Sequence, residues 1–390
     1  MIVGRGDPVD ETLYTKGHVV TELIGVLVAR SGDLKRAVLD YSHHPRFDRV
    51  VRREIRARFG RVATGSEQEL SNFFDWLIQE HRLRDGRTIT EAFADSTSDL
   101  TSAEQDFLRN WRHVREGIFE ITGRVGEVLL AENLIDELPY RIHANVGPAI
   151  FDQMPTGSFL ATRVVPVATE WLISGAPAIF GADREHDVLS LAATLATRRP
   201  DLVYVNPDKL ARGWEMQYAQ HEAFVEHFGS DEITVDPSDL IPTMRGYWAS
   251  LGNQALADTL NTDWIHDDVE SIGIIYDRSA GLGCYADYTL VCDAFASPDL
   301  VRGGRHRETI RAYLDDDTVD PVPLLRLADR YPDNASRVLR LALGKPAFRW
   351  DTDGEALLRR KKAAWYAHEH LPHVTVIGDR LVERLQTTES

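Results

Sequence analysis

The chain has 390 residues, of which 43% are hydrophobic and 27% charged, a composition typical of soluble globular proteins with material for two or three domains. Its formal net charge of −17 disfavours nucleic-acid binding by the chain as a whole, and its two cysteines cannot form a disulfide framework or a four-ligand zinc site. No apolar run approaches the roughly 20 residues needed to cross a bilayer. The first residues do not show the basic region followed by an apolar region that is typical of a signal peptide. We therefore expect a cytoplasmic protein without a membrane partner.

The first part of the chain has a helical pattern. Helical periodicity runs from about Thr12 to Arg61 and predicts three helices, with breaks at Ser31-Gly32 and at His43-His44-Pro45. The third helix, over residues 46–60, has one apolar face made by four residues at intervals of four, Phe47, Val51, Ile55 and Phe59.

The opposite face of this third helix is basic. It carries Arg49, Arg52, Arg53 and Arg56. Arginines on one side of a helix can contact nucleic-acid phosphates, so these four residues are the candidate nucleic-acid-binding site. A solvated face, paired with acidic residues from elsewhere in the chain, is the alternative interpretation.

Charge is unevenly spread along the chain. Residues 1–62 contain 12 basic and 8 acidic residues, a balance of +4, whereas residues 201–330 contain 24 acidic and 10 basic residues, a balance of −14. This polarity predicts association with a protein partner, or self-association, through opposite charges that salt would weaken.

Two capped helices follow the basic helix. Ser66 with Glu69, and Thr101 with Glu104, have the spacing of a capping box, in which the two side chains satisfy backbone N–H groups at the start of a helix. Apolar residues at helical spacing after each box predict two amphipathic helices.

Helical periodicity gives way to short alternating runs between Gly117 and Phe180. Glycine and proline residues separate runs that predict five strands, at 118–121, 125–130, 140–142, 159–167 and 170–173. Five short strands at near-regular spacing predict a compact antiparallel sheet or a small barrel.

Residues 66–175 carry a resemblance. The segments LSNFFDWLIQEHRLRDGRTITEAF and LTSAEQDFLRNW, followed by GIFEI, NLIDE, GSFLATRVVPV and WLISG, resemble uncharacterised bacterial proteins related to the SEC-C-motif-containing proteins. The resemblance implies helices that lead into a small β domain, and it implies no activity. Those relatives carry a short cysteine- and histidine-rich segment that binds zinc. This chain has no such segment, so the resemblance does not imply a zinc site here.

Beyond residue 183 the pattern is mostly helical, with a helix expected over Met244–Leu260 and a strand over Ser271–Tyr276. The whole chain therefore predicts an α+β, multidomain fold. Its expected parts are a helical N-terminal region over 1–62, a helical segment over 63–116 that packs on the β domain, a small antiparallel β domain over 117–183, and a mostly helical C-terminal domain over 184–390.

A glycine motif follows the expected strand. Gly281-Leu-Gly-Cys-Tyr-Ala286 has the pattern of a dinucleotide-binding turn before a helix, but it is separated from the strand, and no second strand with an acidic end follows. A glycine-bearing turn is the favoured interpretation. Cys284 would lie at the start of the helix, where the helix dipole would lower its pKa and suit a nucleophile, although a buried cysteine is commoner.

His266, Asp267 and Asp268 form the candidate metal site. Metal-dependent phosphohydrolases use such a His-Asp pair together with an earlier histidine and a later aspartate. The candidates for these partners are His221, His227, Asp315, Asp316 and Asp317. A polar loop or a helix cap is the alternative interpretation.

Near the C-terminus, four consecutive basic residues, Arg359 to Lys362, precede Trp365 and Tyr366. Basic residues beside aromatic ones can bind nucleic acid or a phosphorylated partner. Because this helix begins with acidic residues and ends with basic ones, complementation of the helix dipole explains the same pattern.

The sequence contains neither a nucleophile elbow nor a phosphate-binding loop. Together with the patterns above, this predicts a non-catalytic cytoplasmic protein with a binding, scaffolding or regulatory function. Such a protein would act through protein–protein contacts and would need no cofactor. One alternative is a metal-dependent hydrolase around His266 and Asp267, which would need a divalent metal. The other is a nucleic-acid-associated protein that uses the basic helix over 46–59.

Overall fold

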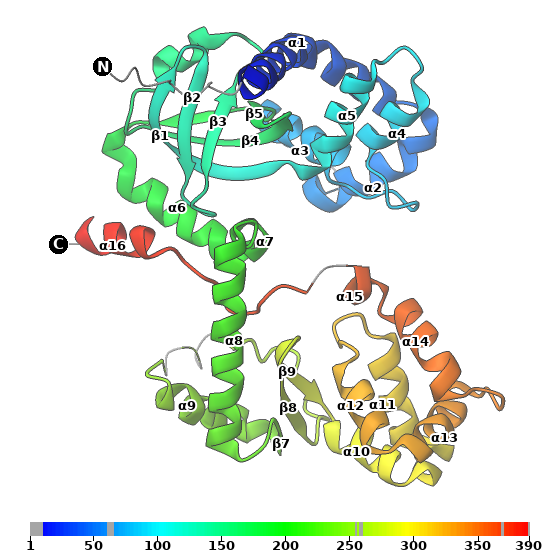
Figure 1. Ribbon diagram of the computed structural model, residues 1–390. Helices are drawn as coiled ribbons and strands as arrows, with labels where there is room; N and C mark the ends of the chain where they lie inside the picture. The colour runs from blue at the N-terminus through cyan, green and yellow to red at the C-terminus, as the bar shows by residue number, and fades with distance from the viewer. Residues whose placement is uncertain (1–10, 61–65, 254–255, 257–259, 368–369, 389–390) are drawn as a thin grey trace, which may run out of the picture. The chain divides into compact units, whose positions relative to one another are not determined.

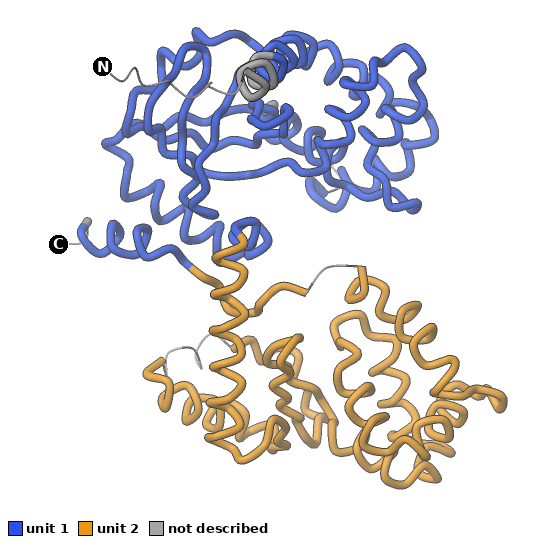
Figure 2. The backbone as a smooth tube through the Cα atoms, in the orientation of Figure 1, with its two compact units in different colours: residues 1–206, 377–390 blue, residues 207–376 orange. Residues whose placement is uncertain are grey.

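The computed structural model describes residues 11–60, 66–253, 256, 260–367 and 370–388, and the chain divides into two compact units. Unit 1 contains the residues up to Asn206 together with the segment from Ile377, and unit 2 is Pro207–Val376 (Figure 2). The predicted boundaries near 117 and 183 coincide with changes of secondary structure inside unit 1, and the one near 62 lies outside the described residues. The division between the units comes after Asn206.

Unit 1 begins with helices that lie together beside a β-barrel (Figure 1). They are α1 (Glu11–Ser42), η1 (Pro45–Phe47), α2 (Asp48–Phe59), α3 (Glu67–Gln79), α4 (Ile89–Ser96), α5 (Ser102–Asn110) and η2 (Trp111–His113). The predicted break at Ser31-Gly32 is wrong, because α1 continues through it. Ser31 is buried, and its hydroxyl donates to the carbonyl oxygen of Val28 at 2.7 Å, which keeps the polar group satisfied within the helix.

Side-chain caps set where these helices start. The capping boxes predicted at Ser66 and Thr101 are both present, and Thr88 forms a third with Glu91. Each box satisfies two backbone N–H groups that a helix start would otherwise leave without partners. The helices then bury Phe73, Leu77 and other apolar side chains in one common core.

The predicted small β-barrel is confirmed. Its strands are β1 (Arg115–Val125), β2 (Val128–Asn133), β3 (Pro139–His143), β4 (Phe159–Val167) and β5 (Glu170–Ile173), with the short β6 (Ala178–Phe180) added beside β4. The order β1-β2-β3-β5-β4 closes because β4 also pairs with β1. All these pairs are antiparallel except β3–β5, which is parallel. This strand order, with η3 (Pro148–Gln153) between β3 and β4, is that of an OB-fold barrel.

The barrel is packed on both its inner and outer surfaces. Its interior holds Phe119, Ile142, Leu160 and similar apolar side chains. On the outside, Val165, Val167 and Leu172 join the core of the N-terminal helices and so fix those helices against β4 and β5. The remaining helices of unit 1 are η4 (Ala182–Arg184), α6 (Glu185–Arg198), α7 (Pro200–Val203) and the C-terminal α16 (Asp379–Thr388), which packs on α6.

Unit 2 is built on a small antiparallel sheet with helices on both faces (Figure 1). Its elements are α8 (Pro207–Phe228), β7 (Glu232–Val235), η5 (Pro237–Asp239), α9 (Leu240–Ser250), β8 (Ile272–Asp277), β9 (Gly281–Ala286), α10 (Tyr288–Ala296), η7 (Pro298–Arg302), α11 (Gly304–Asp315), α12 (Val322–Arg330), α13 (Pro332–Leu343), α14 (Trp350–Lys361) and α15 (Ala363–Ala367). The helix predicted over Met244–Leu260 ends at Ser250, and residues 254–255 and 257–259 of that prediction lie outside the described residues.

The central strand β8 serves two cores because successive side chains point to opposite faces. Ile272 and Ile274 pack with Phe224 and Tyr247 of α8 and α9. Ile275 packs on the other face, in the core formed by α10 to α14. The predicted α+β fold is therefore confirmed. In the described part of the chain, no helix is both long and apolar enough to span a membrane.

Candidate nucleic-acid interface

Helix α2 has the two faces that the sequence predicts. Its apolar residues, among them Val51, Ile55 and Phe59, pack against the core of the N-terminal helices. The four predicted arginines are all exposed on the opposite side. They line a shallow hollow of about 600 Å³ together with Asp48 and Ala57.

A second basic segment lies next to α2. It is the turn between α3 and α4, in which Leu83 N donates to Arg87 O at 2.8 Å and Gly86 N donates to Leu83 O at 2.9 Å. Gly86 has φ +82, a left-handed conformation that glycine adopts without strain. The turn therefore holds Arg82, Arg84 and Arg87 together on the surface.

The two segments border one cavity of about 790 Å³. Its lining includes six arginines, Arg46, Arg49, Arg53, Arg82, Arg84 and Arg87. Arg49 and Arg53 also line the hollow over α2, so the two cavities are neighbours. We call these six residues, with Arg52 and Arg56, the arginine surface.

Some members of the arginine surface are paired within the protein. Arg53 lies 2.6 Å from Glu54, and Arg82 lies 3.3 Å from Glu91. The Arg87 guanidinium donates to Asp85 at 2.6 Å and lies 3.3 Å from Asp95. The arginine of each pair is exposed, although Glu54 is partly and Glu91 largely buried, so each guanidinium group keeps N–H donors that can bind another anion.

Other members have no such partner. Within the described ranges, the side chains of Arg49, Arg56 and Arg84 make no ion pair and no hydrogen bond. Arg49 comes from α2 and Arg84 from the turn, and both line the larger cavity. Each segment thus contributes at least one uncompensated cation to the same space.

Aromatic side chains form part of the cavity wall. The Arg46 guanidinium carbon lies 4.6 Å from the ring centroid of Tyr41 and 4.5 Å from that of Phe47. Its guanidinium also donates to the Tyr41 hydroxyl. Stacking of this kind orients the planar group while its remaining N–H donors stay available.

His81 is the histidine of the cavity lining, and its surroundings perturb its protonation. Its ring packs edge-on against Trp76, with centroids 5.3 Å apart. Burial lowers the pKa of His81 below 6.5; Arg53 also lowers the pKa, and Glu54 opposes them. The imidazole is therefore neutral at physiological pH, and a bound anion would favour its protonated form.

The candidate metal residues belong to unit 2, where they are on the loop between α9 and β8. His266, Asp267 and Asp268 are all exposed. His221, a proposed partner, is buried with its ring against Tyr276 at 5.8 Å. Among the residues that the structure describes, no three histidine, cysteine or acidic side chains are grouped so as to hold a metal ion. The metal-dependent hydrolase thus remains a prediction from sequence without support from this geometry.

The glycine motif is neither a turn nor a dinucleotide loop. Gly281–Ala286 is strand β9, which pairs with β8 in a hairpin. The turn comes earlier, where Asp277 Oδ1 accepts from the backbone N–H groups of Ser279 and Ala280 at 2.8 and 3.0 Å. Cys284 lies within β9 and not at the start of a helix, and burial raises the pKa of its thiol to about 11, in agreement with the buried cysteine that was the commoner interpretation from sequence. This environment opposes formation of the reactive thiolate.

Sequence reasoning missed the contributions of Arg46, Arg82, Arg84 and Arg87. The segment Arg82-Leu-Arg-Asp-Gly-Arg87 has three arginines in six residues, a local signal that could have marked it as basic. Its proximity to α2 follows from the packing of α3 and α4 and could not be read from that segment alone.

One comparison with known proteins finds a relationship. The model of a family of unknown function (DUF7986) matches residues 41–200, a range that contains the whole arginine surface and the barrel. No curated protein and no solved structure matches the chain.

Proposed function

We propose that this chain is a non-catalytic nucleic-acid-binding protein that holds the phosphate backbone on the arginine surface. The observation that carries the proposal is the convergence of α2 and the α3–α4 turn on one cavity lined by six arginines. Arg49 and Arg84, one from each segment, have no counter-ion in the described part of the chain. A backbone-binding site needs several cations at fixed spacing, and two rigid segments supply them.

The chemistry of the side chains favours phosphate as the ligand. All the cations of this surface are arginines, whose planar fork of N–H donors matches two phosphate oxygens at once. Asp85, the carboxylate paired with Arg87, is exposed and can be replaced by phosphate at small cost. Since the rest of the chain is strongly acidic, its repulsion would direct a polyanion to this surface.

The barrel gives weaker support. Barrels with this strand order bind oligonucleotides in many proteins, but a fold alone does not assign a function. Here Glu120 and Glu132 on the outside of β1 and β2 are acidic and already bound by Arg380 of α16. We therefore place the ligand on the arginine surface and not on that part of the barrel.

The predicted scaffolding function makes a different use of the same residues. In that case the arginine surface would bind the acidic region of a second copy or of another protein. Both functions predict that salt weakens binding, so salt dependence alone does not distinguish them. A direct measurement of nucleic-acid binding together with the oligomeric state distinguishes them.

The experiment is a fluorescence-anisotropy titration of the full chain with labelled single-stranded DNA, single-stranded RNA and duplex DNA over a range of salt concentrations. The test variant is Arg49→Gln/Arg84→Gln. The matched control is Arg302→Gln/Arg349→Gln, which removes the same charge from two exposed arginines of unit 2 that pair with Asp299 and Asp351.

We expect binding at low salt that is weakened severalfold or more by the test variant and unchanged by the control. The slope of log affinity against log salt should fall by about 1.4 for single strands when two phosphate contacts are removed. No binding at low salt, or equal loss in both variants, would refute the proposal. Salt-sensitive self-association without nucleic-acid binding would support the scaffolding function instead.

A further inference from the structure

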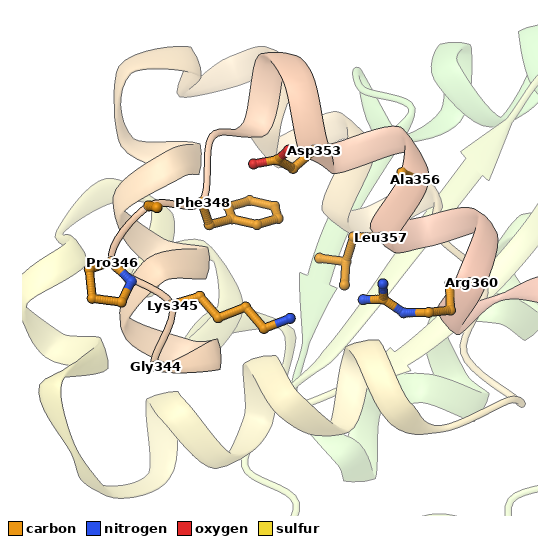
Figure 3. Close-up of a pocket in the computed structure, with 9 residues that line it drawn as sticks. Gly344, Lys345, Pro346, Phe348, Asp353, Ala356, Leu357 and Arg360 are labelled. Carbon is orange, nitrogen blue, oxygen red and sulfur yellow. The ribbon is translucent and has the colours of Figure 1, made fainter.

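Unit 2 contains a second cationic hollow, unrelated to the arginine surface. It lies between the loop after α13 and one face of α14, and its volume is about 570 Å³ (Figure 3). Its lining includes Lys345, Phe348, Asp353, Ala356, Leu357 and Arg360. This volume lies within the range of ordinary small-molecule sites.

The loop side of the hollow is held by backbone contacts. Gly344 ends α13 with φ +66, and Lys345 N donates to Arg340 O at 3.1 Å. Phe348 N donates to Lys345 O at 3.1 Å, and Arg340 Nε donates to Phe348 O at 2.7 Å. The loop is therefore a fixed wall, with the Phe348 ring largely buried in it.

The helix side is one face of α14. Asp353, Leu357 and Arg360 are spaced four and three residues apart and so lie above one another on the helix. Leu357 is buried and forms an apolar floor with Phe348. The Asp353 carboxylate accepts from Arg349 N at 2.9 Å, which ties the loop to the first turn of α14.

Arg360 differs from its basic neighbours. Arg359 donates to Glu355 at 2.8 Å, Lys361 pairs with Asp315, and Lys362 donates to the carbonyl oxygen of Asp316. In the described ranges, the side chain of Arg360 has no ion pair and no hydrogen bond, and the same holds for the Lys345 ammonium group. The ends of these two side chains extend into the same space (Figure 3).

Complementation of the helix dipole accounts for basic residues in the last turn of α14. It does not account for Lys345, which belongs to the other wall and points into the same hollow. Lys345 and Arg360 repel each other across this space, and Asp353, the one carboxylate among the lining residues, forms no ion pair with either side chain, so an anion placed between the two cations would relieve the repulsion.

We propose that this hollow binds a small organic anion, with its carboxylate or phosphate group between Lys345 and Arg360 and its apolar part on Phe348 and Leu357. Arginine and lysine together bind such groups through charge-assisted hydrogen bonds. The buried floor supplies the apolar contact that distinguishes this ligand from an inorganic ion. The site lies within unit 2 and does not depend on the nucleic-acid proposal.

The test uses two fluorescent probes on the full chain. The first, 8-anilinonaphthalene-1-sulfonate, carries an anionic group on an aromatic body; the second, N-phenyl-1-naphthylamine, has nearly the same body without the charge. The test variant is Lys345→Met/Arg360→Met, and the matched control is Arg349→Met/Arg359→Met, which removes two exposed arginines from the same region. Ala356→Trp is a third variant, designed to fill the hollow from an exposed position.

We expect saturable binding of the anionic probe that weakens about tenfold or more in the test variant and stays unchanged in the control. Binding of the uncharged probe should change little in the test variant, whereas Ala356→Trp should weaken both probes. Circular dichroism checks that each variant is folded. The proposal is overturned by absence of saturable binding of the anionic probe, by equal loss in test and control variants, or by loss of both probes in the test variant.

Discussion

Arg384 on α16 donates from Nη1 to Oε2 of Glu120 on β1 at 2.6 Å, which joins the C-terminal helix to the barrel across 264 positions of the chain. Arg380, one turn earlier, donates to the same Glu120 oxygen at 3.1 Å. Arg384 also lies 2.7 Å from Glu185 of α6. The chain leaves unit 1 after Asn206 and returns to it at Ile377, so these contacts fix the returning segment.

Glu120→Gln should loosen α16 without unfolding the barrel. The amide keeps the size of the side chain but removes the charge that two guanidinium groups share, which should cost about 1–2 kcal/mol of local stability. Hydrogen exchange of the α16 amides should then be about 5–30 times faster. Glu127→Gln, at an exposed position without a charged partner in the described residues, is the control and should leave exchange unchanged. Equal exchange rates of the α16 amides in both variants would show that the apolar packing of α16 on α6 is enough to hold α16 in place.

A buried ion pair connects the N-terminal helices of unit 1. Lys35 Nζ of α1 lies 2.7 Å from Asp75 Oδ1 of α3, and the same ammonium donates to the carbonyl oxygen of Ser174 after β5. The Asp75 side chain is 2% exposed. Burial raises the pKa of Asp75, and Lys35 and Arg163 oppose that rise.

Lys35→Met should therefore destabilise the protein by about 3 kcal/mol at neutral pH, because it leaves a buried carboxylate without its cation. The double variant Lys35→Met/Asp75→Leu should recover most of that loss. With the pKa of Asp75 raised above its unfolded value, the native state binds the extra proton, so the deficit of Lys35→Met should shrink as the pH falls through the raised pKa. Chemical unfolding of the four members of the cycle measures these values; additive single effects would contradict a coupled pair.

Local patterns predicted the elements of this fold well. The four-residue spacing of Val51, Ile55 and Phe59 located α2, and alternation bounded by glycine and proline located the five barrel strands. Both patterns can be read from residues close in sequence, because the buried face of a helix or strand places apolar residues at a fixed spacing along the chain. The break expected at Ser31-Gly32 failed because burial of one face of α1 stabilises a helix beyond local propensity.

The site was only partly predictable. The basic face of α2 was visible because its residues repeat on one helix, but the cavity is also lined by Arg84, which tertiary packing brings to the same cavity as Arg49. The glycine motif misled for a related reason. Whether Gly281 begins a phosphate loop or a strand depends on pairing with β8, and Asp277 directs the chain into that hairpin by capping the turn.

The two glycines Gly246 and Gly273 should respond in opposite ways to alanine. Gly246 lies exposed in α9 with open space around its Cα, so Gly246→Ala should stabilise by about 0.5–1 kcal/mol through lower chain entropy and better helix propensity. A Cβ on Gly273 of β8 would overlap the Tyr288 ring, which is fully buried, so Gly273→Ala should destabilise by about 1–3 kcal/mol. Thermal unfolding of both variants measures this; changes of the same sign would show that the Tyr288 ring moves aside.

His81 gives a reporter for occupation of the arginine surface. Burial and Arg53 hold its pKa below 6.5 in the free protein, and Glu54 raises it in part. A bound phosphate backbone favours the imidazolium, so the pKa of His81 should rise when single-stranded DNA binds. Between the free and bound pKa values the complex then holds more protons than the free protein. The affinity should therefore increase as the pH falls from neutral through the pKa that His81 has in the complex. NMR titration of the His81 ring with and without DNA measures the pKa directly, and His81→Gln should remove this part of the pH dependence. An unchanged His81 pKa in the presence of saturating DNA would show that the ligand lies away from the cavity between α2 and the α3–α4 turn.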